Sequence, residues 1–197
     1  MPKDKDEYDV RLSKKLSYLL RHGAIKEGLK IKANGFVAID ELLPTCLREY
    51  TLHDIRKVVE KNNKNRFTLA LNDGVWEIKA NQGHSLKTVN NLHLRNLKSV
   101  NFDIVHGTYC TNWESIKKQG LSRMNRNHIH FAKGINFVCG LRKNAEVFIY
   151  IDFDKATKDN ILFFESENNV ILSPGDSEGL IAPKYFKKVL SGDVKLL

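Results

Sequence analysis

Apolar residues recur at helical spacing near the start of the chain. Within residues 9–22 most of them fall on one stripe, namely Val10, Leu12, Leu16, Leu19 and Leu20. This spacing predicts an amphipathic helix with one buried face. Gly23 follows at once and is a natural C-terminal stop for that helix.

Two shorter helices are predicted before residue 61. Residues 36–39 form a short strand candidate, and Asp40 then resembles the N-cap of a helix over residues 41–47. Thr51, followed three residues later by Asp54, has the pattern of a capping box. The apolar face of that next helix consists of Leu52, Ile55, Val58 and Val59.

From residue 67 the helical spacing gives way to alternation. Phe67, Leu69 and Leu71 alternate with other residues, residues 72–74 read Asn-Asp-Gly, and residues 75–78 return as a second strand. Three helices followed by a β-hairpin predict a winged-helix arrangement, a frame often used to bind nucleic acid. A fold by itself does not establish a function.

The second half of the chain is richer in short strands. Thr111 and Glu114 predict a capped helix that ends at Gly120. Polar turns separate strand candidates at residues 102–106, 128–132, 146–152, 161–165 and 170–173. Many short strands with few helices predict a compact mixed β lobe.

These patterns together predict an α+β protein with two lobes, residues 1–95 and 96–197. Its net charge of +9 is unevenly spread along the chain. Residues 1–99 hold 19 Lys and Arg against 12 Asp and Glu, a balance of +7, and residues 100–197 hold 13 against 11, a balance of +2. A basic surface commonly binds a phosphate backbone, because neutralised phosphates release counterions. A solvated lysine-rich face explains the charge equally well.

Apolar run lengths and cysteine spacing exclude several classes of protein. No apolar stretch approaches the roughly 20 residues that cross a bilayer, and the N-terminus lacks the apolar core of a secretory signal. The three cysteines, Cys46, Cys110 and Cys139, form no CxxC pair and predict free thiols in a reducing compartment. We expect a cytoplasmic protein without a membrane partner, and nothing in the sequence demands more than a monomer.

Arg21 and His22 adjoin at the end of the first predicted helix. Both have a simple explanation as cations near the negative end of a helix dipole. The functional alternative is a phosphate clamp, because a guanidinium fits phosphate oxygens and a histidine titrates near neutrality. Arg66, just before the predicted hairpin, is by itself an ordinary surface arginine.

Three histidines of the second half could share one site. His128 and His130 are two residues apart on a predicted strand, and His106 opens the tripeptide His106-Gly107-Thr108. A zinc site is one reading of these imidazoles, but no carboxylate or cysteine nearby completes the ligand set. Core or cofactor-pocket histidines are the alternative. No Walker-type or GxGxxG sequence and no Ser-His-Asp arrangement is present.

The order of these motifs along the chain resembles the tRNA/RNA 2′-phosphotransferase family. The matching segments are residues 12–14, 19–23, 35–37, 66–67, 80–85, 106–108 and 124–131, with a weaker match at 179–186. One position departs from the family pattern. Lys79 stands where the family often has arginine, which keeps the charge and loses bidentate binding.

This resemblance implies an N-terminal winged-helix RNA lobe and a C-terminal lobe of the NAD⁺-dependent ADP-ribosyltransferase type. It also implies a two-step reaction. An internal RNA 2′-phosphate attacks the nicotinamide-ribose carbon of NAD⁺ and expels nicotinamide. The ribose 2″-hydroxyl of the ADP-ribosylated RNA then attacks phosphorus, releasing 2′-hydroxyl RNA and ADP-ribose 1″,2″-cyclic phosphate. No metal is needed.

The resemblance also assigns roles to individual residues. Arg21, Arg66 and Arg126 match the family's three catalytic arginines, and His22 matches its catalytic histidine. The residues expected to line the NAD⁺ pocket are His106, Gly107, Thr108 and His130. Those expected to contact RNA are Lys14, Lys79, Gln82, His84 and Ser85.

Three alternatives stay open at this point. An ADP-ribosyltransferase that leaves ADP-ribose on a nucleic-acid phosphate end would need the same NAD⁺ pocket but only the first step. A non-catalytic winged-helix RNA-binding protein would bind RNA without consuming NAD⁺. A zinc hydrolase would use the three histidines of the second half.

Overall fold

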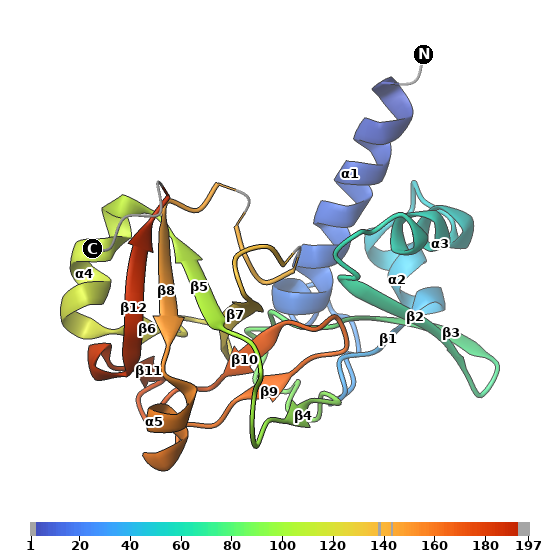
Figure 1. Cartoon of the computed structure of the whole chain (residues 1–197). Coiled ribbons are helices and arrows are strands. Elements are labelled where there is room, and N and C mark those ends of the chain that lie inside the picture. The colour runs from blue at the N-terminus through green and yellow to red at the C-terminus, as the bar shows by residue number, and fades with distance from the viewer. Residues whose placement is uncertain (1–2, 138, 143, 193–197) are drawn as a thin grey trace. The chain divides into compact units, whose positions relative to one another are not determined.

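The computed structural model describes residues 3–137, 139–142 and 144–192 (Figure 1). The chain forms two compact units, Met1–His93 and Leu94–Leu197, each with an apolar core of its own. Helices and several antiparallel sheets make the fold α+β, as the sequence predicts. Within the described residues, no helix combines the length and the apolar character needed to span a membrane.

The N-terminal unit begins with a long helix. Helix α1 (Lys3–Tyr18) runs directly into a π-helical turn, η1 (Leu19–Gly23). Three leucines spaced four residues apart are fully buried and form the stripe expected from the sequence: Leu12, Leu16 and Leu20. Val10 was expected on the same stripe, but its side chain is 52% exposed and lies outside the core.

Gly23 ends this element for a reason that differs from the prediction. The residue after it, Ala24, continues in right-handed helical conformation, so Gly23 is not a left-handed C-cap. A Cβ at Gly23 would lie 2.5 Å from Cε1 of Tyr18. The missing side chain therefore makes room for the Tyr18 ring one turn earlier.

The next two helices test two predicted caps. Helix α2 (Ile39–Cys46) begins after Ala38, so the prediction of Asp40 as its N-cap is wrong. Asp40 lies in the first turn instead, where its carboxylate still interacts favourably with the positive end of the helix dipole. The capping box of α3 (Leu52–Glu60) is confirmed. The Thr51 hydroxyl accepts from the Asp54 N–H, and the Asp54 carboxylate accepts from the Thr51 N–H at 2.8 Å.

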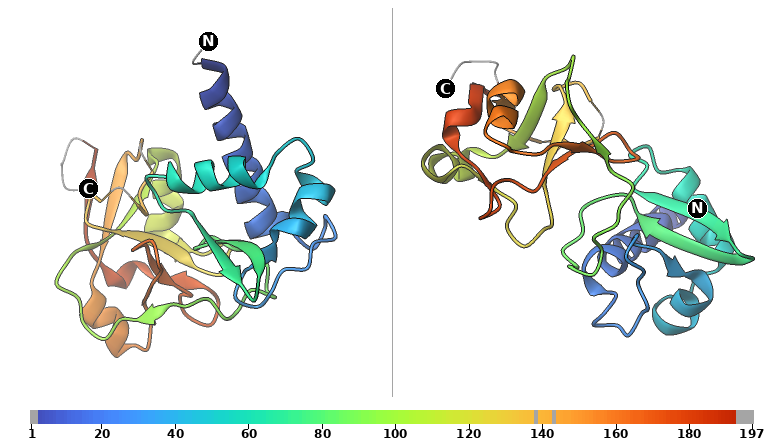
Figure 2. Two further views of the ribbon diagram at one scale, coloured as in Figure 1. Left: turned by 90° about the vertical axis from the view of Figure 1, so that its right-hand side faces the viewer. Right: turned by 90° about the horizontal axis from the view of Figure 1, so that it is seen from below.

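The predicted hairpin is confirmed. Strands β2 (Phe67–Asn72) and β3 (Val75–Ala80) pair antiparallel, and Asn72 faces Val75 across a two-residue loop. That loop, Asp73-Gly74, has φ of 49° and 79°, as a type I′ turn requires. Strand β1 (Val37–Ala38) pairs with the other edge of β3. Figure 2 shows this hairpin beside the helices of the same unit.

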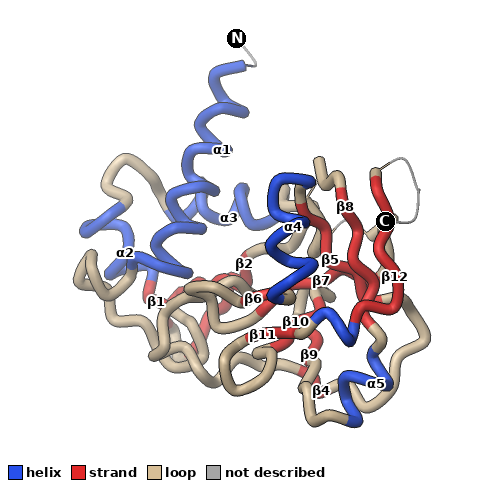
Figure 3. Tube along the Cα trace, turned by 90° about the vertical axis from the view of Figure 1, so that its left-hand side faces the viewer, coloured by secondary structure: helices blue, strands red, loops and turns tan. Residues whose placement is uncertain are grey.

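The C-terminal unit is built on one antiparallel sheet of seven strands (Figure 3). Their order is β12-β8-β5-β7-β10-β9-β4. The bounds are β4 (Arg95–Asn96), β5 (Ile104–Thr108), β7 (Ile129–Lys133), β8 (Val147–Ile151), β9 (Phe164–Glu165), β10 (Ile171–Ser173) and β12 (Phe186–Ser191). A separate short ladder joins β6 (Leu121–Ser122) to β11 (Leu180–Ile181).

Helices flank this sheet. They are α4 (Cys110–Gln119), α5 (Phe153–Lys158) and the short 3₁₀ turn η2 (Pro183–Tyr185). The predicted cap of α4 at Thr111 is wrong, since the helix begins at Cys110 and the Cys110 N–H donates to the Glu146 carboxylate at 2.9 Å. The predicted end at Gly120 is confirmed by its φ of 91°. A Cβ there would also lie 2.4 Å from the Ile181 carbonyl oxygen.

The strand predictions hold for the centre of this sheet and fail towards its margins. Strands β5, β7, β8 and β10 overlap the predicted ranges with bounds shifted by one or two residues. Of the predicted strand 161–165, only β9 is extended and paired. The sequence patterns did not predict β4, β6, β11, β12 or α5.

Candidate active site

In the N-terminal unit, Arg21 and His22 both contact the segment that follows β3. The Ser85 N–H donates to the Arg21 carbonyl at 3.0 Å. The Ser85 hydroxyl oxygen lies 2.9 Å from Nδ1 of His22. One serine thus fixes the backbone of the arginine and the ring of the histidine. A hydrogen bond at Nδ1 fixes the orientation of the imidazole ring.

Gly83 lies against the side chain of Arg21. A Cβ at this position would be 3.2 Å from Nε and 3.4 Å from Cζ of Arg21. Gly83 also has a φ of 93°, a conformation that other residues rarely adopt. The absence of a side chain at residue 83 therefore leaves space for the Arg21 guanidinium.

Arg66 is held by two asparagines. Its Nη1 donates to the side-chain oxygen of Asn62 at 3.2 Å, and its carbonyl accepts from the Asn81 N–H at 2.9 Å. The Asn81 side chain is itself buried, donates to the Asn65 carbonyl and accepts from the Thr68 hydroxyl. Backbone and guanidinium of Arg66 are thus fixed by different partners.

Three of the predicted catalytic residues therefore surround one short segment, residues 81–85. Asn81 binds Arg66, and Ser85 binds Arg21 and His22. Neither Asn62 nor Asn81 was predicted from the sequence to support the site. The asparagine-rich run at residues 62–65 could have indicated a turn held by side-chain hydrogen bonds.

The five residues expected to contact RNA differ in exposure. Lys14 is exposed, and Gln82 and Ser85 are partly exposed. Lys79 and His84 are buried, and the Lys79 ammonium lies 5.0 Å from the centre of the Phe36 ring. An ammonium over an aromatic face is attracted by the ring quadrupole, so this contact can stabilise the fold without an RNA partner. The RNA contacts of all five residues stay predictions.

In the C-terminal unit, β5 and β7 diverge where the predicted NAD⁺ residues lie. Their pairing covers Ile104 and Val105 of β5, whereas β5 pairs with β8 from Ile104 as far as Thr108. Beyond the shared pairing, Nδ1 of His106 lies 2.9 Å from the His130 carbonyl oxygen. A side chain thus bridges the two strands where their backbone ladder ends. The predicted pocket residues His106 and His130 are brought together.

Neighbouring side chains occupy the space beside Gly107. A Cβ at this glycine would lie 2.7 Å from Cδ2 of Leu141 and 2.9 Å from Cβ of Ala145. The Thr108 hydroxyl is buried and accepts from the Asn112 side-chain amide at 3.2 Å. Both residues therefore have packing roles, and their contact with a ligand stays a prediction.

Positive charge gathers around His106. Burial lowers the pKa of His106, the hydrogen bond to His130 opposes this, and the charges of Arg142 and Arg126 lower it further. Burial and the charge of Arg142 also lower the pKa of Arg126, although a guanidinium stays protonated at neutral pH. His106 is thus neutral at pH 7 beside two permanent cations. This region suits an anionic ligand.

The histidines do not assemble as a metal site in the part of the chain that the structure describes. No group of three or more His, Cys, Asp or Glu side chains lies together there. His106 is bonded to a carbonyl oxygen, and the His128 ring lies edge-on to Phe164 at 6.4 Å. His128 also precedes β7, so the prediction that it lies in one strand with His130 is wrong.

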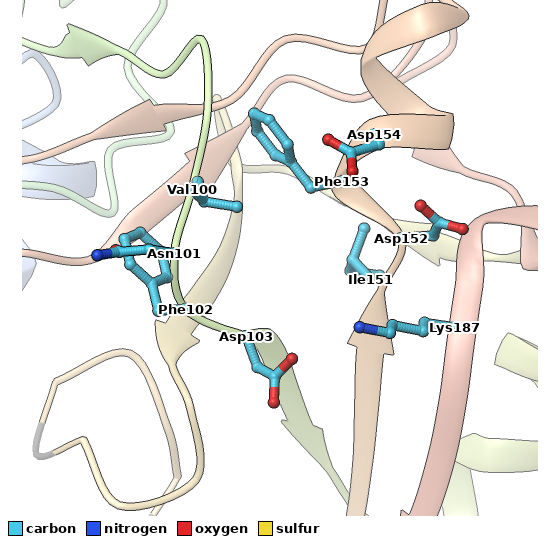
Figure 4. Close-up of a pocket in the computed structure, with 9 residues that line it drawn as sticks. All are labelled: Val100, Asn101, Phe102, Asp103, Ile151, Asp152, Phe153, Asp154 and Lys187. Carbon is cyan, nitrogen blue, oxygen red and sulfur yellow. The ribbon is translucent and has the colours of Figure 1, made fainter.

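A pocket of about 620 Å³ lies elsewhere in the C-terminal unit (Figure 4). It contains none of the predicted site residues. Its charged lining consists of Asp103, Asp152, Asp154 and Lys187. Three carboxylates against one ammonium repel a phosphate or a diphosphate, so this pocket does not fit the predicted ligands.

Comparisons with known proteins agree with the motif pattern. Residues 7–175 match the family described as RNA 2′-phosphotransferase, Tpt1/KptA family. The chain is 45% identical to tRNA 2′-phosphotransferase 1 of Danio rerio, over 94% of this chain and 87% of that protein. It is 44% identical to the Homo sapiens protein of that name, over 96% of this chain and 78% of that protein. It is 36% identical to tRNA 2′-phosphotransferase of Saccharomyces cerevisiae, over 98% of this chain and 90% of that protein. The chain belongs to the RNA 2′-phosphotransferase family.

Proposed function

We propose that this protein transfers an internal RNA 2′-phosphate to NAD⁺. The products are 2′-hydroxyl RNA, nicotinamide and ADP-ribose 1″,2″-cyclic phosphate, formed through an ADP-ribosylated RNA. The observation that carries the proposal is the arrangement of Arg21, His22 and Arg66 around the segment 81–85. These residues match the family's catalytic positions, and the arrangement suits a bound phosphate monoester.

The N-terminal unit, which we propose to be a winged-helix RNA lobe over residues 1–95, holds the 2′-phosphate. A phosphate monoester carries nearly two negative charges at neutral pH. Arg21 and Arg66 offset this charge and orient the phosphate oxygens. His22, with Nδ1 held by Ser85, handles a proton through Nε2.

The C-terminal unit, proposed as an ADP-ribosyltransferase-like lobe over residues 96–197, binds NAD⁺. Bound NAD⁺ supplies a ribose carbon with nicotinamide as its leaving group. His106 and His130 would line the pocket where β5 and β7 diverge, together with Gly107 and Thr108. Arg126 offsets negative charge on the reacting groups, and the cations around His106 favour a diphosphate.

We propose a tRNA-like RNA as the substrate and a monomer as the active form. Relatives that share 36–45% identity with this chain are named tRNA 2′-phosphotransferases. Lys14, Gln82 and Ser85 are the exposed or partly exposed residues among those predicted to contact this RNA. Lys79 and His84 would act from buried positions, by holding the segment that carries Gln82 and Ser85.

The test uses a short RNA with one internal 2′-phosphate, incubated with the protein with and without NAD⁺ and without added metal. We expect conversion to 2′-hydroxyl RNA only with NAD⁺, with the cyclic phosphate as co-product. RNA that stops at the ADP-ribosylated stage would favour the one-step transferase. Binding of RNA without consumption of NAD⁺ would favour a non-catalytic RNA-binding protein.

Alanine variants test the site residues. Arg21→Ala, Arg66→Ala and Arg126→Ala should each lower kcat/KM by about 100-fold or more, the usual effect of removing one charged or hydrogen-bonding group from a transition state. Arg48→Ala is the control, because Arg48 is exposed and its guanidinium donates to the Pro44 carbonyl of the preceding helix α2. Similar losses in all four variants would refute the assignment.

Arg123 and Arg142 are unsuitable controls for this experiment. The Arg123 guanidinium donates to the Arg126 carbonyl at 3.1 Å. The charge of Arg142 acts on both His106 and Arg126. Loss of activity in either variant could therefore arise through a predicted site residue.

A further inference from the structure

We infer that Asn62 is a positioning residue for the reaction, and that it must be uncharged. It holds the guanidinium of Arg66 through a neutral oxygen, which orients the arginine without neutralising it. The inference rests on the proposed function, in which Arg66 binds the RNA 2′-phosphate. It adds a requirement on a residue that does not itself touch the substrate.

Local hydrogen bonds fix Asn62 next to the guanidinium of Arg66. Asn62 follows the C-cap of α3, and the residue is 8% exposed. The side-chain oxygen accepts from Nη1 of Arg66 and from the Lys64 N–H, both at 3.2 Å. The Asn62 carbonyl accepts from the Asn65 N–H at 2.8 Å, which closes the turn before Arg66. The acceptor is therefore fixed by its own local structure before it meets the arginine.

The backbone of Arg66 is fixed separately. Asn81 binds the Arg66 carbonyl and, through its side chain, the Asn65 carbonyl. Asn65 has a φ of 42°, so the chain reverses sharply just before the arginine. Because Asn81 holds the backbone, the bond from Asn62 is needed only to direct the guanidinium. A change at residue 62 can thus be read as an effect on that side chain.

The charge of the acceptor decides what the guanidinium can do. A carboxylate at residue 62 would keep both hydrogen bonds but form an ion pair with Arg66, and arginine–carboxylate pairs are among the strongest polar contacts in proteins. The substrate phosphate would then compete with a fixed negative charge a few ångströms away. A neutral amide oxygen avoids this competition.

The experiment compares Asn62→Asp with Asn63→Asp. Both add one negative charge to the same turn, and Asn63 is exposed. Affinity is measured for one RNA with and without its internal 2′-phosphate, and kcat/KM is measured with the phosphorylated RNA. Thermal unfolding of each variant reports on the fold.

We expect Asn62→Asp to unfold near the wild-type temperature, since the acceptor for Lys64 is kept. It should lose the preference for phosphorylated RNA and about 10- to 100-fold in kcat/KM, as expected when a hydrogen bond to a charged group is compromised. Asn63→Asp should weaken the binding of both RNAs by the same factor and keep the preference for the phosphorylated RNA. Equal behaviour of the two variants would overturn the inference.

A double variant separates this role from a purely structural one. Arg66→Gln should itself lower kcat/KM with the phosphorylated RNA, and adding Asn62→Asp should then lower kcat/KM no further, because no guanidinium remains to be neutralised. A further loss of kcat/KM in the double variant would overturn the inference. A wild-type protein that neither prefers nor converts the phosphorylated RNA would instead refute the proposed function.

Discussion

The side chains of Arg21 and His22 each lie against a small residue from the segment 81–85. Gly83 leaves space for the Arg21 guanidinium, and Ser85 bonds the His22 ring. Small uncharged neighbours suit such a site, because they orient a cation without offsetting its charge. Arg66 with Asn62 repeats this principle.

Gly83→Ala tests whether the placement of Arg21 matters. The new Cβ would lie 3.2 Å from Nε of Arg21, and the φ of 93° adds backbone strain. Gly28→Ala is the matched control, because Gly28 has a φ of 74° and no atom within 4 Å of the added Cβ.

Both of these glycine variants should lose about 1 kcal/mol of stability in urea unfolding, from strain at a left-handed position. Turnover of 2′-phosphorylated RNA should fall by roughly 10- to 100-fold only in Gly83→Ala, since small displacements of a catalytic group are costly. If the two variants lose equal amounts of activity, Arg21 does not depend on residue 83.

The elements that sequence alone predicts well are those with local signals. The capping box of α3 and the Asp73-Gly74 turn each involve residues only a few positions apart, and both are confirmed. The predicted cap at Asp40 fails because the N-cap of α2 is Ala38, two residues earlier. Local chemistry specifies that a helix occurs nearby but leaves its first residue to tertiary packing.

The missed elements depend on distant partners. Strand β12 contains Lys187 and Lys188, which break the apolar alternation, and it forms by pairing with β8 at the sheet edge. Charged residues on an edge strand are a common device against aggregation, so they do not argue against a strand. Strand β4 has two residues and forms by pairing with β9.

The candidate site shows the same division between local and distant information. Arg21, His22, Arg66 and Arg126 could be named from sequence because the family motifs mark them. The support of Arg66 by Asn62 and Asn81 could not, because it depends on how the end of α3 meets the start of β2 and the end of β3. No local sequence pattern marks residues that hold a site through such junctions, because the tertiary fold alone brings them together.

The buried carboxylate of Glu165 makes a testable contribution to the sheet. It accepts hydrogen bonds from Arg95 of β4 and Lys133 of β7. Burial raises its pKa, but the hydrogen bonds and charges of these two cations lower it more, so the net pKa lies below its ordinary value of 4.5. A lowered pKa in the folded state means that the ionised group stabilises the fold above the ordinary pKa. This stabilisation disappears as the pH falls through the folded-state pKa.

Glu165→Gln should therefore reduce the free energy of unfolding at pH 7 by about 1–3 kcal/mol, through weakened bonds to two cations. The Arg95 side chain is 70% exposed, so its bond adds the smaller part. Urea unfolding at pH 7 and at pH 4 measures the effect. The difference between wild type and variant should shrink at the lower pH. A difference that stays constant would show that the charge of Glu165 does not stabilise the sheet.

At the scale of the whole molecule, positive charge is shared by both units. Dividing the chain at residue 93 gives the N-terminal unit 17 Lys and Arg against 12 Asp and Glu, a balance of +5. The C-terminal unit has 15 against 11, a balance of +4. The excess of positive charge lies mostly in the first half of the sequence. Between the two structural units it is divided more evenly. Both units are therefore basic, which is compatible with the proposed binding of RNA by one and of the NAD⁺ diphosphate by the other.

Salt dependence should distinguish the two proposed ligands, RNA and NAD⁺. Each phosphate contacted in single-stranded RNA contributes about −0.7 to the slope of log affinity against log salt concentration, so about three contacts give a roughly 20-fold loss between about 50 and 200 mM salt. NAD⁺ presents one diphosphate and releases few counterions, so its affinity should fall only about threefold over the same range. Titrations of labelled RNA and of NAD⁺ against the full-length protein measure both slopes. RNA binding as insensitive to salt as NAD⁺ binding would mean that the basic residues are solvated surface charges and that specific hydrogen bonds carry the affinity.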